Sequence, residues 1–162
     1  MRKSEREVKD AAEKFAALLR CGYMTLAIPR GEGAPYLVPL NFGAELAGER
    51  LTLYFHCARE GAKLALLQKC ADVSFCAANM MRVFNKGVAP CGYTTDYESV
   101  CGSGRAEVLS SEEERLHGLR VLMEHYAQEE FPDASFDARA LSLTAVVKVE
   151  VSEWTCKRLV RP

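Results

Sequence analysis

Residues 51–70 read LTLYFHCAREGAKLALLQKC and hold the clearest strand of the chain, followed directly by a short helix. The stretch from Leu51 to His56 is short, apolar and aromatic, which is typical of a strand. Working outward, strand patterns occupy 23–29, 35–42, 72–77, 97–109 and 141–154, and helical patterns occupy 4–20, 60–70 and 111–127. About six short strands joined by hairpins, with the helices set apart from them, predict a mainly β protein with flanking helices, built on a small antiparallel barrel.

Local signals add detail to this outline. Ser4 and Glu7 fit a capping box and predict that the first helix starts there. Residues 79–95 carry no clear pattern, so we expect an irregular loop that is long enough to serve as a functional lid. Gly102 and Gly104 interrupt the strand over 97–109, which indicates a bend or a close approach of another backbone.

Composition limits the classes of protein that the chain can belong to. It has 162 residues, a formal net charge of −1 and 49% hydrophobic residues, which predict a single globular domain over 1–162. The balanced charge argues against nucleic acid or an anionic membrane as partner. The charged N-terminus lacks the apolar block of a secretory signal. Seven cysteines without a C-x-x-C pair predict free thiols in a reducing cytoplasm and no zinc site.

The turn between the strand and the helix of 51–70 is a candidate anion site. Backbone N–H groups at a helix start attract anions, and Gly61 would let a ligand approach the backbone closely. Arg59 and Lys63 add positive charge at the same end, which suits a phosphate. The same residues also fit a plain strand-to-helix turn with solvated cations, so the pattern alone leaves both readings open.

Two further segments carry polar groups of interest. Residues 36–42 read YLVPLNF, and the central Pro39 indicates an edge strand with free main-chain groups that a flat heterocycle can use. His56 could supply a proton near neutral pH, or it could be a core histidine. Cys57 lies beside a histidine and near Arg59, so a reactive thiol and a structural thiol both remain possible.

Four segments, taken in order, resemble the nitroimidazole-resistance-type branch of the pyridoxamine 5′-phosphate oxidase-like flavoproteins. They are residues 1–8 (MRKSEREV), 38–43 (VPLNFG), 53–63 (LYFHCAREGAK) and 97–106 (YESVCGSGRA). The resemblance spans nearly the whole chain, and 53–63 is its most specific part. It implies a six-stranded antiparallel split β-barrel of the FMN-binding type, assembled as a homodimer with flavin at the subunit interface. Cys57 is a departure, because family members often carry Ser or Gly there and a thiol bonds a phosphate poorly.

The resemblance also implies where the FMN cofactor lies. Its phosphate would meet Ala58 to Lys63, with Lys63 as the leading contact, and its ring edge would meet the backbone around Val38 to Asn41. Tyr97 or Trp154 is a candidate for the residue that the partner subunit contributes to the flavin site. The implied cofactor set is Val38, Pro39, Leu40, Asn41, Phe55, His56, Cys57, Ala58, Arg59, Gly61, Lys63, Ser99 and Val100.

The chemistry implied by the resemblance belongs to the flavin. Reduced flavin passes hydride or electrons to a small oxidant such as a nitroheteroaromatic, and His56 is the candidate proton donor. Oxidation of pyridoxamine phosphate is less favoured, because Lys157 and Arg158 alone are too few cations for a second phosphate site. Two alternatives stay open: a flavin- or haem-binding module without turnover, used for storage, sensing or electron relay, and an interaction domain with an empty cleft.

Overall fold

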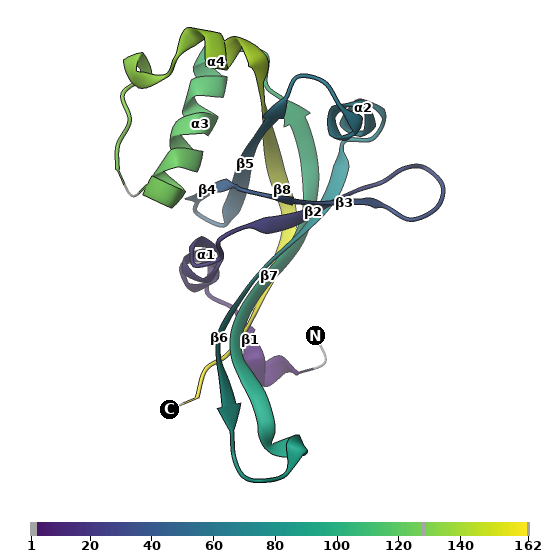
Figure 1. Cartoon of the computed structure of the whole chain (residues 1–162), viewed down its shortest axis with the longest axis vertical. Coiled ribbons are helices and arrows are strands. Elements are labelled where there is room, and N and C mark those ends of the chain that lie inside the picture. Colours follow the sequence, from purple (N-terminus) through teal and green to yellow (C-terminus); the bar gives the residue numbers. More distant parts are fainter. Residues whose placement is uncertain (1–2, 128, 162) are drawn as a thin grey trace.

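The computed structural model describes residues 3–127 and 129–161, and its main feature is one antiparallel sheet of eight strands. The sheet order is β3-β2-β6-β7-β8-β5-β4, with β1 paired onto β8 (Figure 1). The strands are β1 (Glu7–Val8), β2 (Met24–Ile28), β3 (Tyr36–Leu40), β4 (Gly43–Ala47), β5 (Arg50–Ala58), β6 (Asp72–Asn85), β7 (Tyr93–Val108) and β8 (Thr144–Leu159). The mainly β fold of split-barrel type is confirmed, although the sheet is open and has eight strands rather than six. The two additional strands are β1 and β4, which are both short.

The helices flank this sheet, and the first of them starts later than the sequence pattern indicated. They are α1 (Ala11–Leu19), α2 (Ala62–Lys69), α3 (Glu112–Ala127) and α4 (Ala138–Leu143). Asp10 caps α1, since its side chain accepts a hydrogen bond of 2.8 Å from the Glu13 N–H. The expected start at Ser4 is therefore wrong, because Asp10 and Glu13 form a capping pair next to the apolar run, and Ser4 lies in a short 3₁₀ turn.

Most of residues 79–95 are paired strand, which corrects the expectation of an irregular loop, and only residues 86–92 connect the two strands. They belong to a long hairpin in which β6 and β7 stay paired as far as Asn85 and Tyr93 (Figure 1). Most side chains of this part are exposed, so no buried face imposes an alternating pattern on the sequence. The antiparallel partner holds each strand by main-chain hydrogen bonds instead.

Buried ion pairs anchor the base of this hairpin. Glu98 of β7 is only 1% exposed and meets the Arg20 guanidinium at 2.5 Å. Asp96, also 1% exposed, meets Arg82 of β6 at 2.5 Å. Because a carboxylate buried without a partner is costly, these two arginines fix the end of α1 and the path of β6 relative to β7.

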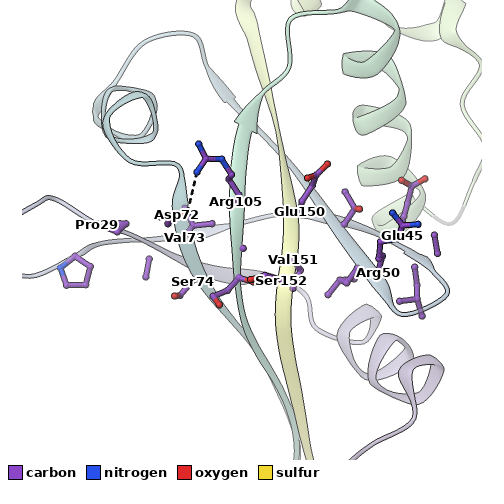
Figure 2. Close-up of a pocket in the computed structure, with 18 residues that line it drawn as sticks. Pro29, Glu45, Arg50, Asp72, Val73, Ser74, Arg105, Glu150, Val151 and Ser152 are labelled. Atoms are coloured by element: carbon purple, nitrogen blue, oxygen red, sulfur yellow. Dashed lines mark hydrogen bonds and ion pairs between the residues drawn. The ribbon is translucent and has the colours of Figure 1, made fainter.

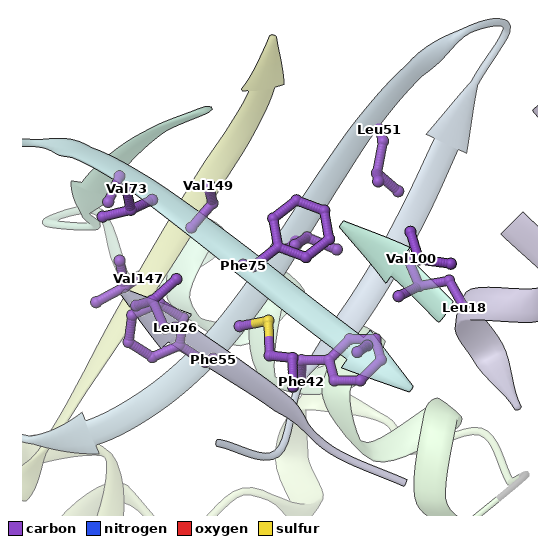
Figure 3. Packing of buried hydrophobic residues seen from close by; sticks show 14 of the residues in the cluster. Leu18, Leu26, Phe42, Leu51, Phe55, Val73, Phe75, Val100, Val147 and Val149 are labelled. Atoms are coloured by element: carbon purple, nitrogen blue, oxygen red, sulfur yellow. The ribbon is translucent and has the colours of Figure 1, made fainter. Parts of the chain in front are cut away.

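The core lies inside the curved sheet, and Figure 3 shows Phe55, Leu26 and Val147 close together, with Phe42 in the same cluster. A second, smaller cluster lies under α3 and includes Tyr54. Since neighbouring residues of a strand point to opposite faces, β5 is buried on both sides, with Phe55 in the main core and Tyr54 under α3. Burial on both sides holds β5 firmly in front of the turn that follows it.

Two glycines and one proline occupy positions that the backbone geometry requires. A Cβ on Gly43 would lie 2.5 Å from the backbone nitrogen of Leu122, so only glycine lets α3 sit this close to β4. A Cβ on Gly102 would lie 2.6 Å from the Glu153 carbonyl oxygen, which confirms the expected close approach. Pro39 lies on β3, the terminal strand of the sheet, which confirms the expected edge position.

Candidate functional site

The turn from β5 into α2 has the backbone form that an anion site needs. Gly61 precedes the helix with φ 131° and ψ 170°, a conformation that side chains with a Cβ rarely adopt. No side chain caps α2 within the described chain. The first N–H groups of the helix therefore point out of its start without a side-chain acceptor, where an anion would be stabilised.

Lys63 supplies a cation at the same place. Its side chain is half-buried, with Nζ 5.6 Å from the centre of the Phe55 ring. Burial lowers the pKa of Lys63, and the neighbouring Cys57 opposes this shift. Within residues 3–127 and 129–161, neither Lys63 nor Arg59 forms an ion pair with an acidic side chain. A half-buried ammonium group without a carboxylate partner fits a bound phosphate.

His56 and Cys57 surround this cation from the end of β5. Partial desolvation lowers the pKa of His56 at the end of β5, and the charge of Lys63 lowers it further. The imidazole is therefore neutral at pH 7. Burial raises the pKa of the half-buried Cys57 thiol, with Lys63 acting in the opposite direction. Cys57 thus stays protonated, which favours the structural reading over a reactive thiol.

The edge strand β3 offers main-chain groups to a ligand. Val38 and Leu40 are half-buried against the core, whereas Pro39 and Asn41 are exposed. Pro39 pairs with Thr25 of β2, and no described strand pairs with the other side of β3. Main-chain groups on that side remain free for a flat heterocycle.

The structure does not bring all the predicted residues to one surface. Phe55 and Val100 are 0% exposed, so core packing occupies their side chains. Ser99 is half-buried on β7, opposite Ala78 and Lys157. The turn at Ala58–Lys63, with His56 and Cys57, forms one cluster, whereas Ser99 and Val100 lie on the strand pair at the base of the hairpin.

Sequence reasoning missed a large open hollow of about 1220 Å³ on the outer face of the sheet. Figure 2 shows polar side chains from several strands around it, among them Ser74, Arg105 and Glu150. None of the predicted site residues lines it. The signal was present, because Asp72 and Ser74 alternate with the buried Val73 and Phe75. Its lining holds three acidic side chains, Glu45, Asp72 and Glu150, and two arginines, Arg50 and Arg105, of which Arg105 meets Asp72 at 3.6 Å.

The two histidines of α3 are structural. His117 bonds Glu45 of β4 at 3.0 Å, and His125 packs edge-on against Phe42 with ring centroids 4.6 Å apart. Among the described residues, no group of three or more His, Cys, Asp or Glu side chains is placed to hold a metal. No described helix is both long enough and apolar enough to cross a membrane.

Comparisons with known proteins point in one direction. Residues 7–158 match the family model described as pyridoxamine 5′-phosphate oxidase. A proposed 5-nitroimidazole antibiotic resistance protein from Bacteroides thetaiotaomicron has 30% identity and a TM-score of 0.78, covering 93% of this chain and 85% of its own. The search of curated proteins found no match.

Two more distant structures share the fold alone. The flavocytochrome Anf3 from Azotobacter vinelandii has 20% identity and a TM-score of 0.76, covering 100% of this chain and 73% of its own. An FAD-binding protein from Mesorhizobium loti has 20% identity and a TM-score of 0.64, covering 94% of this chain and 96% of its own. The fold described above therefore occurs in proteins that carry different cofactors.

Proposed function

The chain belongs to the pyridoxamine 5′-phosphate oxidase family, and from this premise we propose that it is an FMN-binding oxidoreductase that reduces a small oxidant such as a nitroheteroaromatic. The observation that carries the proposal is the half-buried Lys63 beside the uncapped start of α2. A dianionic phosphate at this place would neutralise a cation that burial disfavours.

Several groups of the turn would contact the phosphate, each in a different way. Lys63 and Arg59 would neutralise the phosphate, and the N–H groups after Gly61 would donate hydrogen bonds to its oxygens. Cys57 would add little, because its thiol is a weak hydrogen-bond donor. The free edge of β3 around Pro39 would offer main-chain groups to the ring edge.

When bound, the flavin supplies hydride or electron transfer, and the chain supplies orientation and a proton. His56 is exposed at the end of β5, beside the turn, and is the candidate proton donor. Its lowered pKa keeps it neutral at pH 7, so the protonated form that donates best accumulates only under more acidic conditions. The 30% identity to a proposed nitroimidazole resistance protein supports a nitroheteroaromatic as the substrate class.

We also propose that the working form is a homodimer with the flavin at the subunit interface. The hairpin of β6 and β7 carries exposed apolar side chains, with Met80 65%, Val83 59% and Tyr93 59% exposed. A second copy would cover this surface, and Ser99 at the base of the hairpin would then face the partner's cofactor. The cysteines, all unpaired in the described structure, favour a cytoplasmic setting.

An absorbance scan of the purified chain, repeated after FMN is added and the sample desalted, tests the cofactor. We expect a flavin spectrum that stays with the protein. A haem spectrum would support the alternative of a haem-binding module, and a colourless protein would contradict the proposal.

The activity is tested on the loaded protein. A nicotinamide donor should bleach the flavin, and a nitroimidazole should restore its colour faster than it does with free FMN at the same concentration. Bleaching without faster reoxidation would indicate a flavin-binding module without turnover.

A further inference from the structure

We propose that Cys76 and Cys101 form a dithiol site on the outer face of the sheet, which a small disulfide such as oxidised glutathione converts to a cross-strand disulfide. The two residues are direct register partners on β6 and β7, and their sulfur atoms lie 3.4 Å apart. The reaction itself uses no flavin, and because Cys101 and Ser99 lie on the same face of β7, the test is made on the protein without FMN.

The backbone geometry already suits a bridge. Residues directly opposite each other on antiparallel strands have Cα atoms about 4.5–5.5 Å apart, within the span that disulfides bridge. Both side chains lie on the same face of the sheet, opposite to the buried Phe75 and Val100. Closing the bond to about 2.0 Å therefore requires movement of the two sulfur atoms and little of the strands.

Access also favours this pair over the other cysteines. Cys76 and Cys101 are exposed, whereas Cys21 and Cys156 are buried. In the described residues, no other two cysteine sulfurs lie within hydrogen-bond distance of each other. Each cysteine lies two residues along its strand from a serine that lines the large hollow, Ser74 on β6 and Ser103 on β7. A small disulfide can therefore approach from the solvent-filled side.

The two sulfurs have different roles in the reaction. The Cys101 thiol donates a hydrogen bond to the Cys76 sulfur, and desolvation and this contact raise the pKa of Cys101 to about 11. We therefore assign the first attack to Cys76, whose sulfur accepts this contact, and the second to Cys101. The sulfur of the Cys76 thiolate bonds to one sulfur of oxidised glutathione, the glutathione disulfide bond breaks, and the released thiolate takes up a proton.

The second step closes the bridge. Cys101 loses its proton, its sulfur attacks the Cys76 sulfur of the mixed disulfide, and a second glutathione thiol leaves. Two protein thiols are oxidised by two electrons, and one glutathione disulfide is reduced to two thiols. The product ties β6 to β7 at the base of the projecting hairpin, so that the strands cannot separate there.

Intact mass and peptide mapping after incubation with oxidised glutathione test the proposal on the full chain, with free thiols blocked before digestion. We expect the native protein to lose two hydrogen atoms and to give one crosslinked peptide pair containing Cys76 and Cys101. Dithiothreitol should reverse both signals. A wild-type chain that stays reduced, or that forms its bridge between other cysteines, would overturn the proposal.

Single substitutions test the order of the steps. In Cys101→Ser, Cys76 should retain one glutathione as a stable mixed disulfide, whereas Cys76→Ser should retain several-fold less. Cys91→Ser removes another exposed cysteine from the same hairpin and should leave bridge formation unchanged. Equal labelling of the first two variants would contradict the assigned roles, and the wild-type mapping decides the site even if one variant fails to fold.

Discussion

Replacing Lys63 with methionine removes the charge at the start of α2 and keeps an unbranched side chain over the Phe55 ring, which lies 5.6 Å from Nζ. A hydrogen bond to a charged group contributes about 1.5–3 kcal/mol, so we expect the FMN dissociation constant to rise about 10- to 150-fold. Fluorescence titration measures this constant. Lys69→Met, an exposed lysine in the last turn of the same helix, is the matched control and should bind FMN as the wild type does.

The same change should separate ligand binding from folding. FMN at about 100 times its dissociation constant stabilises a protein by about 2.7 kcal/mol, and a 30-fold weaker complex at that concentration gains only about 0.9 kcal/mol. Without FMN, Lys63→Met should not lose stability, because burial disfavours the charged lysine in the folded state. Thermal unfolding with and without FMN measures both quantities.

The pH dependence of FMN affinity provides a further check on Lys63. Burial lowers the pKa of Lys63 in the folded protein below the ordinary lysine value of 10.5. When no phosphate is bound, the ammonium group therefore loses its proton below pH 10.5. FMN affinity of the wild type should therefore fall as pH rises toward 10.5, and Lys63→Met should lack this decline. Binding by Lys63→Met that equals the wild type, or equal weakening by Lys69→Met, would refute the phosphate site.

Three other predictions concern catalysis and stability. Since burial and Lys63 lower the pKa of His56 below 6.5, nitro reduction should rise as pH falls through that pKa, and His56→Asn should abolish the rise while FMN stays bound. Arg20→Ala leaves Glu98, buried at 1% exposure, with only the longer contact to Arg158 at 3.7 Å, so urea unfolding should show a loss of about 1.5–3 kcal/mol; a loss below about 1 kcal/mol would mean that the pair behaves like a surface salt bridge. Gly43→Ala places a Cβ 2.5 Å from a backbone atom of α3 and should cost about 1–3 kcal/mol by thermal unfolding, whereas Gly22→Ala, with open space around it, should cost less than about 1 kcal/mol.

The sequence correctly predicted those strands, helices and turns that form from residues adjacent in the chain. The strand and helix of 51–70 form from adjacent residues, and the turn between them lies where the sequence pattern indicated. The edge position of Pro39 follows from its missing N–H, which is also a local property. These are the features that outline the candidate cofactor site.

Long-range contacts determined what the sequence could not predict. Residues 7–8 form a strand because β8 lies beside them, more than a hundred residues along the chain. The hairpin beyond Met80 is held by main-chain pairing and exposes most of its side chains, so its sequence carries no alternation. Whether Val100 is buried depends on which face of β7 its side chain occupies. A shift of the strand register by one residue would exchange the two faces.

The place of β8 in the sheet has a consequence for how the chain is assembled during synthesis. β8 is the last of the described strands along the chain, yet it lies between β7 and β5 and also carries β1. Until the ribosome has released residues 144–159, no strand pairs the β4–β5 hairpin with the rest of the sheet. β7 and β5 therefore each expose an unpaired edge. During that interval each of the two parts of the sheet has an unpaired strand edge. Such edges promote aggregation, and chaperones limit it. Loss of β8 would divide the sheet in two rather than shorten it.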